Sequence, residues 1–169
     1  DTLIESTVAD YSAKEDILAT YIMGQMQTGP MLLTGGLRIE RTEFEARGFV
    51  VDEDAETVAQ LDTADEYTDL FPSLNMKLDV SDVMVARVGY YRSAIRPNFA
   101  AVAPRALTNE DFEVEAGNPD LDRQTANNLD LAVEYYPNGS TLIQAGVFYK
   151  KIDDFIAPVF FEGEDNGAG

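Results

Sequence analysis

The fold of this chain is decided by three alternating runs between Leu70 and Tyr136. They are, in order, Phe71-Pro72-Ser73-Leu74-Asn75-Met76-Lys77-Leu78-Asp79-Val80, then Met84-Val85-Ala86-Arg87-Val88-Gly89-Tyr90-Tyr91-Arg92, and finally Asn128-Leu129-Asp130-Leu131-Ala132-Val133-Glu134-Tyr135-Tyr136. Apolar and polar residues alternate in each run, which is the pattern of a β-strand with one apolar face. A turn of two or three residues separates the first two runs, whereas about 35 residues separate the last two. The stretch therefore predicts strand, tight turn, strand, long loop and strand.

Similar runs extend the pattern to both sides of this stretch. Alternation is clear over residues 31–47 and 141–151 and weak over 17–27, which is also expected to be a strand, and a partly extended apolar segment is expected at 155–161. Within 31–47 the apolar face fades after Glu40, and the strand continues as a polar ribbon. A barrel strand that projects beyond a membrane shows this change.

The connections between the runs alternate in length. Short turns at 28–30, 81–82 and 137–140 alternate with long connections at 48–69 and 93–127. In an up-and-down meander, alternate connections lie at the same end, so every short turn falls at one end and every long loop at the other. Outer-membrane barrels have this asymmetry. We therefore expect an all-β, antiparallel up-and-down meander that is part of a large transmembrane β-barrel.

Aromatic residues lie near the ends of several runs, namely Tyr21, Phe71, Tyr90, Tyr135 and Tyr149. They fit the aromatic girdle of a membrane barrel. They also fit the general preference of tyrosine and phenylalanine for strands. Both interpretations remain open from the sequence.

Composition excludes several functions. The 169 residues carry a net charge of −19 with only 12 basic residues, which disfavours nucleic-acid binding. The chain has no cysteine and no histidine, so disulfides, thiolate zinc sites and Cys or His catalysis are excluded. We expect no enzyme activity, no metal site and no cofactor. The acidic residues crowd 52–69, which indicates either a solvated loop or a cation-binding loop.

Several segments, in this order and spacing, resemble the β-barrel of TonB-dependent outer-membrane receptors. The segments are Phe71-Pro72-Ser73-Leu74-Asn75, Arg92-Ser93-Ala94-Ile95-Arg96-Pro97-Asn98-Phe99, Ala103-Pro104-Arg105, Gly117-Asn118-Pro119-Asp120-Leu121, Asp130-Leu131-Ala132-Val133-Glu134-Tyr135-Tyr136 and Gly146-Val147-Phe148-Tyr149-Lys150-Lys151-Ile152-Asp153-Asp154-Phe155-Ile156. The resemblance covers 70–156 well and 11–47 more loosely.

The resemblance implies a barrel of about 22 strands, closed around an N-terminal plug, in the bacterial outer membrane. Residues 1–169 contain no plug and about six or seven strands, so we expect a partial barrel segment that is a piece of a longer protein. The family takes up a scarce small molecule or oligosaccharide with TonB-coupled energy. The TonB complex would contact an N-terminal part outside this chain, and lipid would cover the apolar face.

The long loop at 93–127 is where we expect substrate contacts. Arg96, Asn98, Asn118 and Asp120 are polar residues beside turn-forming prolines, and they are the candidates. The alternative is that they only set the shape of the loop. At the level of the whole chain, the alternative is a soluble β-rich module that binds a ligand or glycan.

Overall fold

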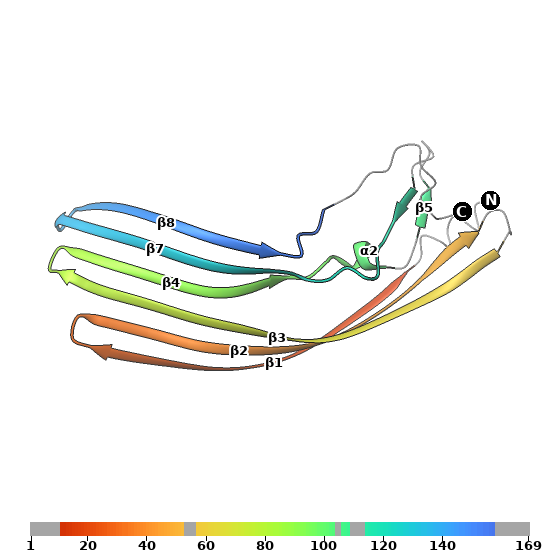
Figure 1. The fold of residues 1–169 in the computed structure, drawn as a ribbon, viewed down its shortest axis with the longest axis horizontal. Helices are drawn as coiled ribbons and strands as arrows, with labels where there is room; N and C mark the ends of the chain where they lie inside the picture. The colour runs from red at the N-terminus through yellow and green to blue at the C-terminus, as the bar shows by residue number, and fades with distance from the viewer. Residues whose placement is uncertain (1–10, 53–56, 104–105, 109–113, 158–169) are drawn as a thin grey trace.

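A computed structural model describes residues 11–52, 57–103, 106–108 and 114–157. One antiparallel sheet holds six strands, and their order in space is their order along the chain. The strands are β1 (Ser12–Thr28), β2 (Met31–Asp52), β3 (Thr57–Ser81), β4 (Met84–Ile95), β7 (Gln124–Asn138) and β8 (Thr141–Asp153). The predicted all-β meander is therefore confirmed (Figure 1).

The short turns lie together at one end of the sheet, at the left in Figure 1, and we call this the turn end. They are Gly29-Pro30, Asp82-Val83 and Gly139-Ser140. Gly29 has a φ of 55°, in the left-handed region that glycine enters without strain. The opposite end, called the loop end, carries the long connections.

The predicted bounds of one of the two long loops are wrong. The sequence predicted a loop over 48–69, but β2 continues to Asp52 and β3 begins at Thr57. The register is unbroken from the turn end to the Asp52↔Thr57 pair. Ion pairs between the two strands stabilise this polar hairpin, for example Arg41 Nη2 to Glu66 Oε1 at 2.9 Å. The charges that suggested a loop therefore belong to a strand pair that projects past the apolar region.

The other long connection has structure of its own. The helix α2 (Phe99–Val102) follows β4, and a two-stranded ribbon pairs β5 (Ala106–Thr108) with β6 (Val114–Ala116). In the described residues no helix is long and apolar enough to cross a membrane. The segment at 155–157 is not a strand, and the remainder of the expected 155–161 segment lies outside the described residues.

The two faces of the sheet differ in chemistry. Residues paired directly across neighbouring strands point to the same side, so the register assigns every side chain to a face. The inner face is the one that carries α2, because Phe99 of α2 stacks on Phe44 of β2 with ring centroids 6.2 Å apart. The inner face carries the polar residues of the alternating runs, namely Asn75, Lys77, Asp79, Arg87, Asn128, Asp130, Glu134 and Gln144.

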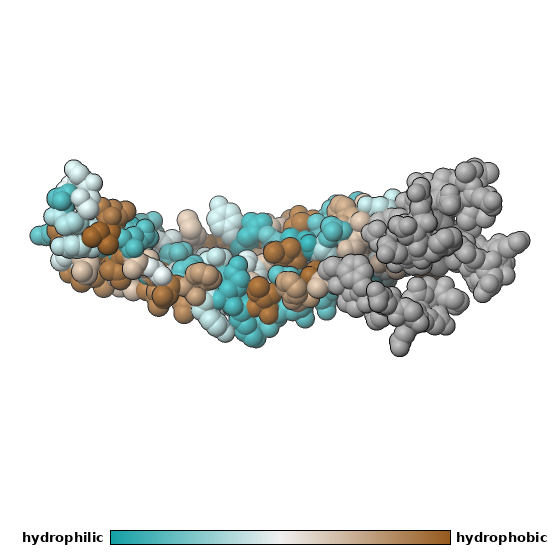
Figure 2. Space-filling view, turned by 90° about the horizontal axis from the view of Figure 1, so that it is seen from above, coloured by the Kyte–Doolittle hydropathy of each residue, from teal (hydrophilic) through white to brown (hydrophobic). Residues whose placement is uncertain are grey.

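The outer face carries an apolar band. Its members include Leu18, Ile22, Met26, Leu33, Leu37, Ile39, Leu70, Leu74, Met76, Leu78, Val88, Tyr90, Leu129, Leu131, Val133, Ile143, Val147 and Tyr149. Many of these side chains are exposed, and Figure 2 shows hydrophobic residues at the surface in the half with the short turns. A soluble sheet would bury such a face, whereas a membrane barrel presents it to lipid.

The edge of the band nearest the loop end begins as a straight row across three strands. Tyr90, Leu129 and Tyr149 are the last large apolar residues of the outer face in β4, β7 and β8, and they are cross-strand neighbours. Leu74 of β3 continues the same row. Two of the five aromatics, Tyr90 and Tyr149, thus lie where a girdle requires them.

Beyond this row the edge shifts along the strands. In β3 the apolar face runs four residues past Leu74 to Leu70, whose partner Ile39 ends the unbroken apolar stretch of β2. In β1 it runs two residues farther still, to Leu18, the partner of Arg41. A shift of six residues at about 3.4 Å each, over five steps of about 4.8 Å, corresponds to strands tilted by roughly 40°. Barrel strands are tilted by about 35–45° in a membrane, so the oblique edge is that of a tilted barrel wall.

The girdle interpretation holds for only part of its residues. Tyr135 lies on the outer face near the turn end, with Tyr90 and Tyr149 at the other edge of the band. Tyr21 and Phe71 lie on the inner face, because their register partners include the inner-face residue Arg38. These two residues therefore follow general strand preference rather than the girdle.

Candidate functional site

The candidate site lies at the loop end of the inner face, where α2 covers the wall. Val102 and Ala103 are buried at this contact, and Phe99 packs on Phe44. The side chain of Asn98 caps the helix by accepting a hydrogen bond of 2.7 Å from the amide of Ala101. Asparagine is a favoured N-cap because it satisfies an amide that the helix leaves free. The cap fixes where the chain turns after β4.

Arg96 joins the start of this loop to the wall. Its Nη2 donates to Glu40 Oε2 at 2.7 Å and to Thr42 Oγ1 at 3.1 Å. Its Nε lies 3.4 Å from Glu15 Oε1. Thr42 is fully buried, and the side chain of Arg96 is only 23% exposed. Hydrogen bonds to ionised groups are among the stronger ones in proteins, so this contact holds the loop against β1 and β2.

The carboxylate of Glu40 receives two arginines. Arg38 Nε donates to its other oxygen at 2.6 Å, from the same strand. Glu40 lies just past Ile39, beyond the end of the apolar band. The hydrogen bond from Arg96, followed by that from Arg38, holds the pKa of Glu40 below its ordinary value although burial opposes this. Glu40 therefore remains ionised when the loop is attached.

Arg123 joins the far end of the loop to the wall in the same way. Its Nε lies 2.8 Å from both carboxylate oxygens of Asp69, and its guanidinium lies 4.2 Å from the ring centre of Tyr67. Asp69 is 3% exposed, so the ion pair is well shielded from water. Cation–π contact with Tyr67 adds to it. Together Arg96 and Arg123 form what we call the two loop anchors.

Asn118 and Asp120 form a turn against α2. The amide of Asn118 donates to the carbonyl of Ala101 at 2.7 Å, and its Oδ1 accepts from the amide of Asp120 at 2.9 Å. Gly117 allows this close approach, because a Cβ there would lie 2.1 Å from the carbonyl oxygen of Ala103. The side chains of Asn118 and Asp120 are exposed.

The structure thus brings three of the four predicted site residues together around α2. Arg96 and Asn98 make contacts that shape the loop, and Asn118 combines such a contact with an exposed side chain. Asp120 lies beside Asn118 on the exposed turn. Substrate binding by the four residues stays a prediction.

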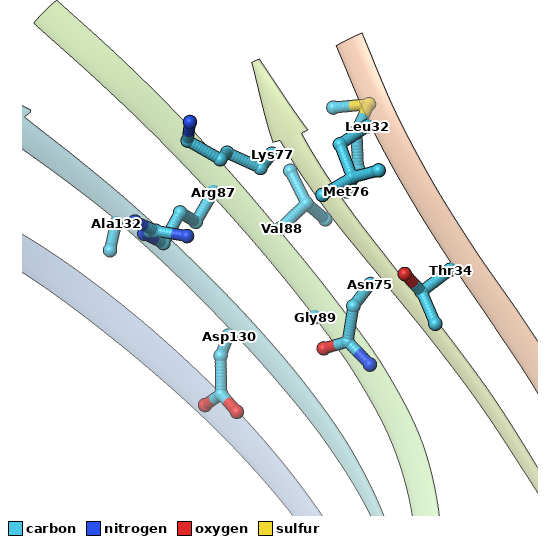
Figure 3. Close-up of a pocket in the computed structure, with 10 residues that line it drawn as sticks. All are labelled: Leu32, Thr34, Asn75, Met76, Lys77, Arg87, Val88, Gly89, Asp130 and Ala132. Carbon is cyan, nitrogen blue, oxygen red and sulfur yellow. The ribbon is translucent and has the colours of Figure 1, made fainter. Parts of the chain in front are cut away.

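A groove of mixed polar and apolar lining continues along the inner face toward the turn end (Figure 3). Its volume is about 340 Å³, and it crosses β2, β3, β4 and β7. Thr34, Asn75, Lys77, Arg87 and Asp130 place polar side chains along it. Gly89 leaves room in its floor. This arrangement provides charged groups, one hydroxyl and one amide to whatever occupies the interior of the barrel.

Beside the groove, Arg87 and Glu134 form a bidentate pair across β4 and β7. Nε to Oε1 is 2.7 Å and Nη2 to Oε2 is 3.2 Å. The hydroxyl of Tyr136 donates to the same carboxylate at 2.9 Å. Within the described part of the chain, no group of three or more acidic side chains could hold a metal ion.

The sequence missed the partners of the loop anchors. Alternation placed Glu40 and Thr42 on the polar face of the 31–47 run, but nothing in their spacing indicated that Arg96 would reach them. Asp69 was assigned to a loop. The signal that could have found it is the continued alternation through Tyr67, Asp69 and Phe71, which the density of charge obscured.

Comparisons with known proteins agree with this geometry. Residues 2–168 match the family described as outer membrane protein beta-barrel family. The fold is similar to the closed form of the ferric-catecholate import receptor Fiu from K12 E. coli, with a TM-score of 0.62 and 17% identity over 84% of this chain and 22% of that chain. The siderophore receptor PirA from Pseudomonas aeruginosa matches with a TM-score of 0.46 and 16% identity over 95% of this chain and 36% of that chain. No curated protein matches.

The chain therefore spans about a fifth of the Fiu structure. The resemblance to TonB-dependent receptor barrels is confirmed as a shared barrel-wall fold. Both matched structures are named as receptors, Fiu for ferric-catecholate import and PirA for siderophores.

Proposed function

We propose that this chain, which belongs to the outer membrane protein beta-barrel family, forms part of the wall of an active transporter that takes up a scarce substrate with TonB-coupled energy. The protein is located in the bacterial outer membrane. The family places the chain in a membrane, so the soluble-module alternative is set aside. TonB would engage a part of the full-length protein outside these residues, and no catalytic role is assigned.

One observation carries the proposal: the loop after β4 is attached to the polar inner face by Arg96 and Arg123 at the loop end. The outer face is apolar, so the inner face lines the interior of the barrel. A loop held over the inner face narrows the route into the barrel on the side opposite the short turns. In outer-membrane barrels that side is extracellular, where a substrate is first met.

Within this loop, Asn118 and Asp120 are the residues that support substrate contact. Their side chains are exposed on one turn, and they offer an amide and a carboxylate. Such groups hydrogen-bond hydroxyl-rich ligands as well as amide-bearing chelators. The receptors of similar fold are named for ferric-catecholate and siderophore substrates, so a ferric siderophore is the first small molecule to test. An oligosaccharide is the second.

The test uses the purified full-length protein and calorimetric titration with each ligand class. We expect one ligand class to bind. The double variant Asn118→Ala, Asp120→Ala should weaken its binding by about tenfold or more, because the loss of one hydrogen bond that involves a charged group already lowers affinity by about this factor. The matched control is Glu66→Gln, which removes an exposed carboxylate from the outer face. Unchanged affinity in the double variant would remove the ligand role of these two residues.

Transport is tested separately in cells that express the full-length protein. Uptake of the bound ligand should stop when a protonophore collapses the proton-motive force. Uptake that continues at the same rate would contradict active transport while leaving the barrel-wall assignment intact.

A further inference from the structure

A second feature lies on the outer face, one step beyond the apolar band. Arg92, Asn127 and Lys151 are direct cross-strand neighbours on β4, β7 and β8. They follow the row Tyr90, Leu129 and Tyr149, toward the loop end. The row thus places two cations at the level where the lipid chains end, which is where lipid headgroups lie.

Arg92 is exceptional among the arginines of the described residues. Every other one forms an ion pair. Arg92 has neither an ion pair nor a hydrogen bond within the part of the chain that the structure describes, and its Nε is buried. A buried donor without a partner is costly, and native structures rarely leave one so. The chain itself covers this Nε, so a partner from outside would meet the terminal nitrogens of the half-buried side chain, which are also unpaired within the described residues.

Within the described residues, Asn127 presents a free amide donor beside Arg92. The hydroxyl of Tyr90 donates to Asn127 Oδ1 at 3.0 Å. This bond occupies the acceptor of the amide and leaves its Nδ2 as a donor on the same row. Lys151 adds an ammonium whose side chain is 62% exposed and which pairs with Asp153 Oδ1 at 2.9 Å.

The corresponding positions on the other strands are different. In β2 the first polar residue past the band is Arg41, and it is held by Glu43 at 3.0 Å and Glu66 at 2.9 Å. Farther along, Arg47 is paired with Asp62. In a chain with a net charge of −19, Arg92 leaves a positive charge available on this row, whereas Lys151 is shared with Asp153.

We propose that Arg92, Asn127 and Lys151 bind the phosphate of an anionic lipid headgroup at the outer surface of the barrel. A guanidinium, an amide nitrogen and an ammonium together provide the donors that a phosphate group accepts. The tyrosines of the neighbouring row contact the upper part of the acyl chains. Basic residues at a membrane surface attract anionic lipids in this way.

The test uses the full-length protein in detergent and native mass spectrometry with two lipids of the same acyl chains. Phosphatidic acid carries the phosphate, and diacylglycerol lacks it. We expect phosphatidic acid to be retained, Arg92→Gln to weaken retention by about tenfold, and Lys151→Gln by about threefold because Asp153 already occupies it in part. Arg41→Gln is the matched control, with less than about a twofold effect.

The outcomes separate the possible sources of the anion. Equal retention of phosphatidic acid by the wild type, Arg92→Gln and Lys151→Gln overturns the proposal. Displacement of phosphatidic acid by inorganic phosphate at equal concentration overturns the assignment to a lipid. Migration of unheated samples on gels reports folding, and if Arg92→Gln does not fold, Lys151→Gln carries the test.

Discussion

The substitution Arg96→Met should release the loop from the wall without unfolding the sheet. Methionine keeps the length and the apolar stem of the side chain but removes the guanidinium. The bonds lost are those to Glu40 at 2.7 Å and to Thr42 at 3.1 Å, together with the contact to Glu15. Glu40 keeps its bond to Arg38, so it is not left as an unpaired buried charge.

The size of the effect follows from these contacts. A hydrogen bond to a charged group stabilises by about 1.5–3 kcal/mol, and the partial exposure of Arg96 favours the lower part of that range. We take about 2 kcal/mol, which corresponds to a roughly 30-fold increase in the population of the open loop. The loss of stability is local to the loop, because among the described residues this anchor connects only α2 and its flanking residues to β1 and β2.

Hydrogen–deuterium exchange on the full-length protein in detergent measures this opening. The amides of Ala103 and Asn118 bond to carbonyls within the loop, so their exchange should accelerate by about 30-fold in Arg96→Met. Arg38→Met is the matched control, because it removes an arginine from the same carboxylate without touching the loop. If the exchange of these amides is the same in wild type and Arg96→Met, the anchor does not hold the loop and the reasoning is refuted.

Further predictions follow from other contacts. Arg123→Met should cost about 3–5 kcal/mol of loop attachment, because Asp69 is left buried and unpaired, and Asp69→Asn should restore part of it; exchange at the same amides reports both. Gly117→Ala should open the loop, since its Cβ would clash with a backbone oxygen. Gly139→Ala, with open space around it, should leave the exchange rates of the loop amides unchanged. The ionised carboxylate of Glu40 stabilises loop attachment, and its pKa is lowered from the ordinary value of 4.5. Acidification should therefore open the loop as pH falls below 4.5 and through this lowered pKa; a loop opening that does not depend on pH in wild type would contradict this. Leu131→Lys on the outer face should cost about 2–4 kcal/mol of folding in lipid, and Gln144→Lys on the inner face much less, as urea titrations in vesicles would show.

The faces of the sheet could be predicted because a strand has a period of two. Each run with Leu or Val at every second position places the intervening residues on the other side, and the register confirmed this for Asn75, Arg87 and Asp130. The same rule underlies the order of the strands, since tight turns leave neighbouring runs no other partner. These parts of the fold depend on local pattern.

The hairpin beyond Glu40 could not be predicted in the same way. Past the band charged residues lie on both faces, and their density obscures the alternation that would distinguish a strand from a loop. Its strands are joined by an unbroken backbone register, and exposed cross-strand ion pairs such as Arg47 with Asp62, 15 residues apart, add a little to this. The loop anchors are harder still, because Arg96 and Glu40 are 56 residues apart and the chain offers 31 acidic residues as partners.

The central claim is a tilted barrel wall with lipid on its outer face. It is tested most directly by measuring how deeply individual side chains lie in the membrane. The chain has no cysteine, so single cysteines can carry spin labels. Leu70 and Asp153 each lie four residues past one cross-strand row, at Leu74 and Tyr149, yet the oblique band places Leu70 at its edge and Asp153 beyond it. We predict that in the reconstituted full-length protein the label at 70 is relaxed more by oxygen, and the label at 153 more by an aqueous nickel complex. Equal accessibility at the two positions, or the reverse order, would contradict the account.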